Sequence, residues 1–191
     1  ESGLFDVVMV STDDEEIAQI ATEYGAQVPF IRSADNSNDF ATTVDVITEV
    51  LYWYSIQGYE FNQATCIYAC APFVSSELLK ESFALLEKEN CDCVFPSLVY
   101  SHPIQRALKV AANGKIELFD PSSSNSRTQD LEKAFYDAGM FYTFDVSRLR
   151  ITKSLRTTNT FTIEVDDLLA QDIDNENDWK LAEMKYKLFF K

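Results

Sequence analysis

The stretch FDVVMVSTDDEEIAQIATEYGAQVPFI, residues 5–31, decides the fold class that the chain is expected to adopt. Phe5–Val10 is an almost continuous apolar run, which is typical of a central parallel strand. Thr12 and Glu15 then have the spacing of a capping box, and apolar residues follow at helical spacing. Val28–Ile31 is a second strand-like run. Strand, helix and strand in about thirty residues predict a βαβ unit and therefore an α/β protein.

The rest of the chain continues this alternation and predicts a three-layer α/β/α, Rossmann-like domain around a mixed, mostly parallel sheet. Helices are expected from about Thr43, from Ser75 and over Trp179–Phe190, and strands at Ala64–Ala69, Cys93–Tyr100, Phe135–Phe144 and Thr160–Val165. Pro96 lies inside one expected strand and indicates an edge position or a bulge. Gly139 lies inside another, where glycine often marks the close approach of a ligand or a second backbone.

A β-hairpin is the strongest local signal in the chain. Ala107–Ala111 and Lys115–Phe119 are strand-like runs that flank the dipeptide Asn113-Gly114. Asn-Gly in this position predicts a type I′ turn. A hairpin inserted between core elements often protrudes, so we expect residues 101–121, approximately, to project and to cover a partner chain.

Acidic residues dominate the charge of the chain. There are 31 Asp and Glu against 16 Lys and Arg, which gives a formal net charge of −15. Such a field repels nucleic acid and anionic membranes, so neither is an expected partner. A length of 191 residues with 46% hydrophobic residues suits one packed domain. Without a signal peptide or an apolar run of roughly twenty residues, the protein is expected to be cytoplasmic.

The cysteine and histidine residues do not indicate a zinc site. The four cysteines occur as Cys66-x3-Cys70 and Cys91-x-Cys93, spacings that fit no common zinc motif. Because all four lie in apolar, strand-like runs, we expect buried free thiols and no disulfide framework. His102 is the single histidine, so a Ser-His-Asp triad is not favoured.

A pair of carboxylates, Asp172 and Asp174, lies between a strand-like run and the last expected helix. In an extended segment, residues two apart point to the same side, so both carboxylates are expected to face one way. They repel each other unless a cation or solvent separates their charges. Mg²⁺, which binds one or two carboxylates together with substrate phosphates, is the expected ion. A solvated acidic loop is the other interpretation of these residues.

A calcium-binding module is an alternative for the same segment. The acidic residues at positions 1, 3, 5 and 12 of an EF-hand-like loop over residues 172–183 would be Asp172, Asp174, Glu176 and Glu183. Asn177 stands where that loop has its glycine, and asparagine tolerates the left-handed conformation. The preceding segment disfavours this alternative, because it is strand-like and an EF-hand needs an entering helix.

Two polar loops contain further candidates. Arg32, Asp39, Thr42 and Thr43 lie in a turn-rich loop after a strand-like run, and loops at the carboxyl ends of parallel strands bind ligands in α/β proteins. Ordinary loop and capping roles are the alternative for these four residues. In the Ser-rich loop over residues 120–130, Arg127 is the single cation, and its planar guanidinium can bind a carboxylate or a phosphate.

Several short motifs, spread over nearly the whole chain, are similar to those of one known family. They are Val10–Ala18, Gly25–Arg32, Ser101-His102-Pro103, Arg127 before Gln129-Asp130-Leu131, Gly139-x-x-Tyr142, and Asp172-x-Asp174 followed by Asp178 and Leu181-Ala182-Glu183. In this order they resemble the acylneuraminate cytidylyltransferases, the CMP-sialic acid synthetases. Residues 67–73, IYACAPF, replace the Gln-Pro-Thr-Ser-Pro stretch of the sialic acid enzymes and resemble the pseudaminic acid branch.

This resemblance implies an enzyme with a nucleotide-diphospho-sugar transferase fold that transfers CMP from CTP to the anomeric hydroxyl of a nine-carbon keto-sugar acid. Pseudaminic acid is the implied sugar, pyrophosphate is released, and the activated sugar serves surface glycan or flagellin glycosylation. The implied catalytic residues are Asp172 and Asp174, which bind Mg²⁺, and Arg127 beside the sugar or phosphate. The candidate substrate-binding residues from both arguments are Arg32, Asp39, Thr42, Thr43, Tyr68, Gln105, Arg106 and Tyr142. A homodimer is also implied, with residues 101–121 over the neighbouring site.

The chain departs from the family pattern at the sugar side and at its start. Gln105, next to Arg106, replaces the family's lysine, and Ala138 replaces its asparagine, so the sugar identity is open. The family's Gly-Ser-Lys-rich triphosphate loop is absent from the sequence, and Glu1-Ser2-Gly3 resembles the end of a helix. We therefore expect one cytidylyltransferase domain, residues 1–191, that lacks its first strand and loop and is inactive alone. A nucleotidyltransferase for another sugar or cofactor is the third alternative.

Overall fold

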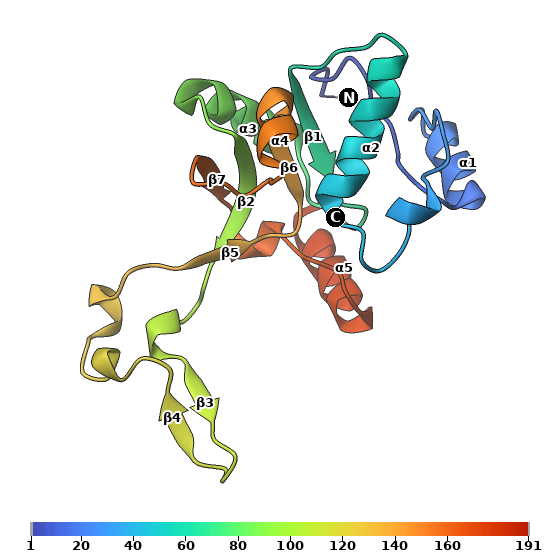
Figure 1. The fold of residues 1–191 in the computed structure, drawn as a ribbon. Coiled ribbons are helices and arrows are strands. Elements are labelled where there is room, and N and C mark those ends of the chain that lie inside the picture. The colour runs from blue at the N-terminus through green and yellow to red at the C-terminus, as the bar shows by residue number, and fades with distance from the viewer. Residues whose placement is uncertain (1, 191) are drawn as a thin grey trace. The chain divides into compact units, whose positions relative to one another are not determined.

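The computed structural model describes residues 2–190, which contain both helices and strands (Figure 1). The helices are α1 (Glu15–Glu23), α2 (Thr43–Ile56), α3 (Ser76–Glu89), α4 (Val146–Thr152) and α5 (Glu176–Phe190). The strands are β1 (Gln63–Ile67), β2 (Cys93–Val99), β3 (Leu108–Val110), β4 (Ile116–Leu118), β5 (Phe135–Asp137), β6 (Phe141–Asp145) and β7 (Thr160–Glu164). Among these described residues, no helix is long and apolar enough to span a bilayer.

The described chain divides into two compact units. Within the described residues, unit 1 comprises residues 2–66, 74–94 and 142–161, and unit 2 comprises residues 67–73, 95–141 and 162–190. Unit 1 therefore contains α1 to α4, and unit 2 contains the β3–β4 hairpin and α5. The expectation of a single domain stays a prediction.

Helices α2 and α3 form in unit 1 because their sequences combine a cap with a buried stripe. The Thr42 hydroxyl accepts a hydrogen bond from the Asp45 backbone N–H, and the Asp45 carboxylate accepts one from the Thr42 N–H, which completes a capping box. Every third or fourth residue of the two helices is then buried, namely Ile47, Leu51 and Tyr54 in α2 and Leu79, Ser82 and Leu86 in α3. The two helices predicted from the sequence are confirmed, and their buried apolar residues contribute to the stability of unit 1.

The first part of the chain departs from the predicted βαβ unit. Phe5–Val10 and Val28–Ile31 are not strands, since an isolated parallel bridge between Met9 and Gln27, the residue before Val28, is all that forms there. Helix α1 forms as expected but buries no residue completely. Its cap is Asp14, whose carboxylate accepts hydrogen bonds from two backbone N–H groups of the first turn, so the predicted capping box at residue 12 is wrong.

The main sheet has the strand order β1-β6-β2-β5, and β7 also pairs with β2. In unit 1, β2 pairs with β6 antiparallel, with Cys93 opposite Phe144. In unit 2, β2 pairs with β5 antiparallel, with Ser97 opposite Asp137. The prediction of a mostly parallel sheet is therefore wrong. It depended on the βαβ reading of the first thirty residues, roughly, and that segment forms only a bridge.

Pro96 lies where the partner of β2 changes from β6 to β5. It is buried, so the predicted edge position is wrong, but the ladder is interrupted there, as a proline without an N–H group requires. The Pro96 carbonyl accepts a hydrogen bond from the Ala138 N–H at 3.0 Å. Across from it, the strand expected at residues 135–144 is split into β5 and β6, since Gly139 has a φ of +67°.

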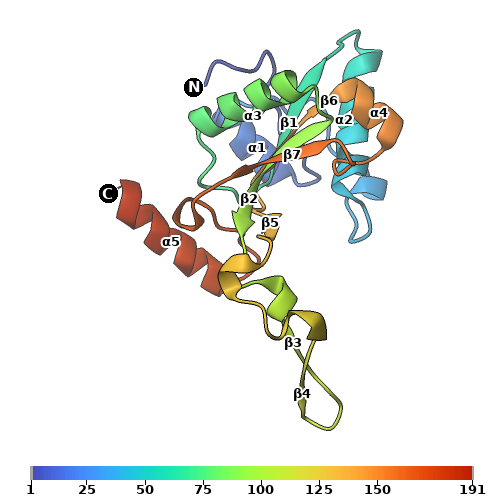
Figure 2. The same ribbon diagram turned by 90° about the vertical axis from the view of Figure 1, so that its left-hand side faces the viewer.

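The predicted hairpin is present in unit 2 as a two-stranded ribbon of β3 and β4 (Figure 2). Its turn differs from the prediction. Gly114 has a φ of +79°, but Asn113 does not have a positive φ, and a type I′ turn requires both. The Gly114 N–H donates to the Ala111 carbonyl, so the turn is type I followed by a left-handed glycine. All three residues of β3 are exposed, which leaves Leu108 and Val110 in solvent.

Candidate active site

The carboxylate pair lies in unit 2, in the irregular segment between β7 and α5. There the carboxylate of Asp172 packs against the backbone of Gly139. A Cβ atom built on Gly139 would lie 2.6 Å from Asp172 Cγ and 2.8 Å from each carboxylate oxygen. Only glycine leaves this space, so Gly139 does mark a close approach, but the approaching group is the Asp172 side chain and not the ligand or second backbone that was expected.

Asp172 faces several negative charges. Partial burial raises the pKa of its carboxyl group, and the neighbouring carboxylates of Asp174, Asp137 and Asp178 raise it further. Asp137 Oδ1 accepts a hydrogen bond from the Gly139 N–H at 2.9 Å, so Asp137 and Asp172 both contact the same glycine. Sequence reasoning missed Asp137, and its position two residues before Gly139 was the available signal.

Helix α5 fixes the far end of this segment. Asp178 Oδ2 accepts hydrogen bonds from the backbone N–H groups of Asp174 and Asn175, each at 3.1 Å. The helix begins at Glu176, so most of the proposed calcium loop, residues 172–183, is helical and cannot wrap around an ion. The segment is also preceded by strand β7 instead of an entering helix. The calcium-loop alternative is therefore wrong.

The donor set at Asp172 and Asp174 suits Mg²⁺. Within residues 2–190, no group of three or more His, Cys, Asp or Glu side chains is arranged as a complete metal cage. Mg²⁺ does not need one, because it keeps several waters and is held by one or two carboxylates plus substrate phosphates. A cation would also relieve the repulsion that raises the pKa of Asp172.

Arg127 is exposed, and its guanidinium is already engaged. Nε donates to Asp130 Oδ2 at 2.7 Å and Nη2 donates to Asp130 Oδ1 at 3.1 Å, a bidentate pair. A substrate anion at Arg127 would have to displace the Asp130 carboxylate. The Arg127 side chain is 71% exposed, so solvent screens the present pair and makes such an exchange inexpensive.

Gln105 and Arg106 lie in the 3₁₀ turn Ile104–Arg106 of the same unit. Arg106 Nη1 donates to Thr128 Oγ1 at 3.3 Å, in the segment that carries Arg127. Gln105 Nε2 donates to the Glu132 carbonyl at 2.9 Å, while Gln105 Oε1 is buried without a hydrogen-bond partner within the described chain. Tyr68, also in unit 2, is half-buried, and its N–H donates to the Met140 carbonyl.

The remaining predicted binding residues lie in unit 1. Arg32 donates from Nη2 to Asp13 Oδ1 at 2.7 Å, and this hydrogen bond lowers the pKa of Asp13. Thr42 caps α2, as the capping alternative predicts, and Thr43 is the first residue of that helix. Asp39 is an exposed turn residue.

Tyr142, in β6 of unit 1, is 4% exposed, and its hydroxyl accepts a hydrogen bond from Arg156 Nη2 at 3.0 Å. Sequence reasoning did not single out Arg156. The candidate residues are thus divided between the units, with Arg32, Asp39, Thr42, Thr43 and Tyr142 in unit 1 and Tyr68, Gln105, Arg106, Arg127, Asp172 and Asp174 in unit 2.

The four cysteines differ in their exposure. All four cysteines are free, as expected. Cys91 and Cys93 are buried, but Cys70 is exposed, so the expectation of burial is wrong for that residue. Burial raises the pKa of Cys66 to about 11, which keeps its thiol protonated at neutral pH.

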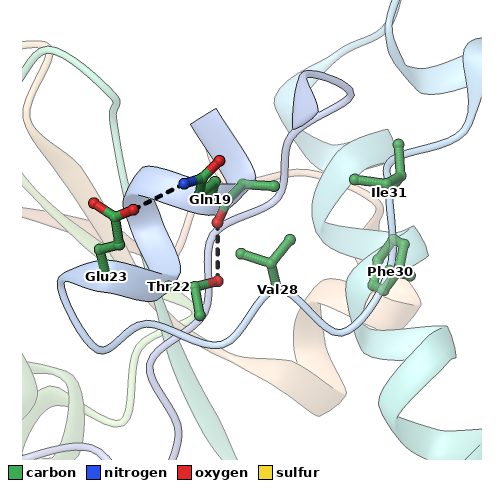
Figure 3. A pocket seen from close by; sticks show the side chains of 7 residues that line it. Gln19, Thr22, Glu23, Val28, Phe30 and Ile31 are labelled. Atoms are coloured by element: carbon green, nitrogen blue, oxygen red, sulfur yellow. Dashed lines mark hydrogen bonds between the residues drawn. The ribbon is translucent and has the colours of Figure 1, made fainter. Parts of the chain in front are cut away.

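A hollow of about 380 Å³ beside α1 in unit 1 contains none of the predicted residues (Figure 3). Its lining is mostly apolar, with Val28, Phe30 and Ile31 on one side. Its polar groups bond to one another or to the helix, since Gln19 donates to Glu23 at 3.0 Å and Thr22 to the Ala18 carbonyl at 2.9 Å. No unsatisfied polar group in this lining indicates a ligand.

The relatives of this chain are consistent with a nucleotide-transferring site. The chain is 32% identical over 188 residues to the pseudaminic acid cytidylyltransferase of Campylobacter jejuni, covering 98% of this chain and 81% of that protein. It is 32% identical over 193 residues to N-acylneuraminate cytidylyltransferase A of Danio rerio, covering 99% of this chain and 43% of that protein. A structure of CMP:2-keto-3-deoxy-manno-octonic acid synthetase complexed with CTP superimposes with a TM-score of 0.61 and 13% identity, covering 97% of this chain and 82% of that one.

At 13% identity, the structural similarity supports the α/β fold alone. The sequence comparisons also identify the family. The model of the family described as cytidylyltransferase matches residues 1–139, well over half of the chain. The chain therefore belongs to the cytidylyltransferase family of enzymes.

Proposed function

We propose that this protein transfers CMP from CTP to the anomeric hydroxyl of a nonulosonic acid, pseudaminic acid, with release of pyrophosphate. The observation that carries the proposal is the Asp172 carboxylate, seated against Gly139 and facing Asp174 and Asp137. The similarity to a pseudaminic acid cytidylyltransferase over nearly the whole chain supports the choice of sugar. The activated sugar would serve surface glycan or flagellin glycosylation, and the reaction would occur in the cytoplasm, where CTP is available.

Asp172 and Asp174 are the residues that would hold Mg²⁺. Bound there, the ion would neutralise charge that develops on the phosphate oxygens and orient the nucleophile and the leaving group. The two carboxylates contribute the rigid part of the site, since the segment that carries them is fixed by Asp178 and by the backbone of Gly139. Their position relative to the substrate then determines how well the reacting atoms are aligned.

Arg127 is the proposed anion-binding residue. Its bidentate pair with Asp130 has the geometry in which a guanidinium binds any planar carboxylate, and the sugar acid has one. Exchange of the Asp130 carboxylate for that of the sugar would preserve both hydrogen bonds. Asp130 therefore acts as a stand-in that keeps the guanidinium oriented before the substrate binds.

The other binding roles are divided between the nucleotide and the sugar. Arg32, Asp39, Thr42 and Thr43 would contact the nucleotide, whereas Tyr68, Gln105, Arg106 and Tyr142 would contact the sugar. The proposal includes a three-layer, Rossmann-like arrangement of one domain and a homodimer in which residues 101–121 cover the neighbouring site. The exposed apolar side chains of β3 support such an interface.

A second candidate is the activation of a different keto-sugar acid by the same chemistry. The observation in its favour is the buried, unpartnered Oε1 of Gln105, an acceptor that selects a substrate with a matching donor. The structural likeness to an enzyme whose name contains an eight-carbon acid is compatible with this alternative.

The test uses the chain extended at its N-terminus by the family's first strand and triphosphate loop, as do the rate measurements below. It measures pyrophosphate release with CTP, Mg²⁺ and a panel of acids: pseudaminic, N-acetylneuraminic, legionaminic and 3-deoxy-manno-octulosonic acid. Turnover with pseudaminic acid at a kcat/KM at least tenfold above the others is expected. A preference for another acid supports the second candidate. Turnover of none of the acids, by a protein that binds CTP, would reject both, and an Asp172→Asn variant provides the background rate.

A further inference from the structure

Lys185 is a buried lysine that none of the roles above uses. It lies on α5 with only 9% of its surface exposed, and Ala182, one turn earlier, is the other residue that α5 buries. An apolar side chain would fill this position at less cost, because burying an ammonium group requires partners for its three N–H donors. A lysine on the buried stripe of a helix therefore needs a reason.

The partners of Lys185 lie just before the carboxylate pair. Its Nζ donates to the Asp167 carbonyl at 2.7 Å and to the Ala170 carbonyl at 2.8 Å. These carbonyls belong to the 3₁₀ turn Asp167–Leu169 and to the residue that follows it. Ala170 is 1% exposed, so without Lys185 its carbonyl would lose its partner in a place that water does not easily reach.

Helix α5 thus contacts the metal-binding segment on both sides of Asp172 and Asp174. Lys185 fixes the backbone before Asp172, and the Asp178 carboxylate fixes the backbone at Asp174. The two α5 residues are about two helical turns apart, which places them on the same face of the helix. A segment fixed at both ends by one rigid element keeps its two carboxylates at a constant separation.

We propose that Lys185 is a positioning residue for the metal-binding carboxylates, an inference that rests on the proposed role of Asp172 and Asp174. Its Nζ holds two backbone carbonyls, so its proposed role is to orient the chain and not to bind the ion. Its hydrogen bonds to two carbonyls fix the path of the chain into Asp172, as outer-sphere groups fix the ligands of other metal sites. Loss of such groups typically weakens metal binding by roughly 10- to 100-fold.

The test measures the binding of Mn²⁺ alone to the full chain, using the electron paramagnetic resonance signal of the free ion. Mn²⁺ prefers the same carboxylate ligands as Mg²⁺. Lys185→Met keeps an unbranched side chain, one atom shorter than lysine, and removes the donors, so it should raise the half-saturating Mn²⁺ concentration about tenfold. Lys187→Met is the matched control, because Lys187 is 56% exposed and pairs only weakly, at 3.6 Å, with Glu183. It should bind Mn²⁺ as the wild type does.

Thermal unfolding without metal separates positioning from stability, since a purely structural lysine would lower the Tm and leave Mn²⁺ affinity unchanged. That outcome would overturn the proposal. If Lys185→Met does not fold, Lys185→Gln replaces it, since its amide nitrogen is one bond closer to the backbone and the variant should still fold. Lys185→Gln should bind Mn²⁺ more weakly than the wild type. Wild-type Mn²⁺ affinity in this variant would equally refute the proposal. Asp172→Asn distinguishes the two levels. If Asp172→Asn binds Mn²⁺ as the wild type does, the proposed metal site itself is rejected. If Asp172→Asn loses Mn²⁺ binding while both Lys185 variants bind normally, only the role of Lys185 is rejected.

Discussion

Replacing Gly139 with alanine should displace the Asp172 carboxylate. The new Cβ would lie 2.6 Å from Asp172 Cγ, whereas ordinary contacts begin near 3.4 Å, so the carboxylate must retreat by about 1 Å. A misplacement of about 1 Å at a catalytic group can lower the rate roughly a hundredfold. The left-handed φ of +67° adds backbone strain of about 1 kcal/mol for a residue with a Cβ.

Gly58→Ala is the matched control for that strain. Gly58 has a φ of +84°, and nothing lies within 4 Å of the position of its Cβ. Both variants should therefore lose about 2–4 °C in Tm, as expected for about 1 kcal/mol in a chain of this length. Only Gly139→Ala should lose rate and Mg²⁺ affinity, measured as pyrophosphate release over a Mg²⁺ titration.

A double variant sharpens the result. If Gly139→Ala acts by moving Asp172, then adding it to Asp172→Asn should change the rate very little, because both changes remove the same function. Equal rates for Gly139→Ala and wild type, with only the Tm lowered, would refute the reasoning. So would fully additive losses in the double variant.

Three other predictions concern the carboxylate pair, Arg127 and Asp92. Asp172→Asn and Asp174→Asn should each raise the chemical barrier by about 3 kcal/mol, seen as a roughly hundredfold lower kcat at saturating Mg²⁺, and normal turnover would exclude them as metal ligands. Arg127→Ala should raise the KM for the sugar acid, and Arg127→Lys should recover little because the bidentate geometry is lost; wild-type KM values in both would leave Arg127 as a surface residue. Asp92 accepts hydrogen bonds from Arg148, Thr157 and Asn159, and although burial would raise the pKa of Asp92, these bonds lower it. Its stabilisation should therefore be complete above the unfolded pKa of about 3.9 and be lost as the pH falls through the lower folded value. Asp92→Asn should then cost about 2 kcal/mol in urea unfolding at pH 7 and less at pH 3, and a pH-independent difference would contradict this.

The elements that sequence reasoning predicted well are those whose causes are local. Helices α2 and α3 have a capping residue and a buried stripe within a dozen or so residues, and these suffice to define them. Strand β7 and the body of α5 are likewise defined by alternation and by helical periodicity. Helix α4 was missed because it is short and directly follows β6, with Asp145 ending the strand and capping the helix.

Sheet direction could not be predicted because it depends on partners far apart in the sequence. Phe5–Val10 has the composition of a central strand, yet only two backbone hydrogen bonds, through Val8 and Val10, join it to Gln27. A strand is defined by its neighbours, and composition does not specify them. Pro96 illustrates the same limit, since its effect on the ladder was expected but the burial of the strand around it was not.

In the candidate site, too, some residues could be recognised from the local sequence and others only from the fold. Asp172 and Asp174 could be found because two carboxylates at alternate positions repel each other unless a cation lies near, and this can be seen in the sequence alone. Lys185 could not, because it acquires its role only through long-range contacts with the carbonyls before Asp172. Asp137 had a local signal, its place two residues before Gly139, but its proximity to Asp172 follows only from the packing of that carboxylate against Gly139. Gly139 is the residue that connects the two levels. In the sequence it is seen as a glycine inside an expected strand. In the structure a glycine is required there because any side chain at residue 139 would collide with the Asp172 carboxylate. The arrangement of this site thus depends as much on the residues that leave space and hold backbone as on those that would bind the ion.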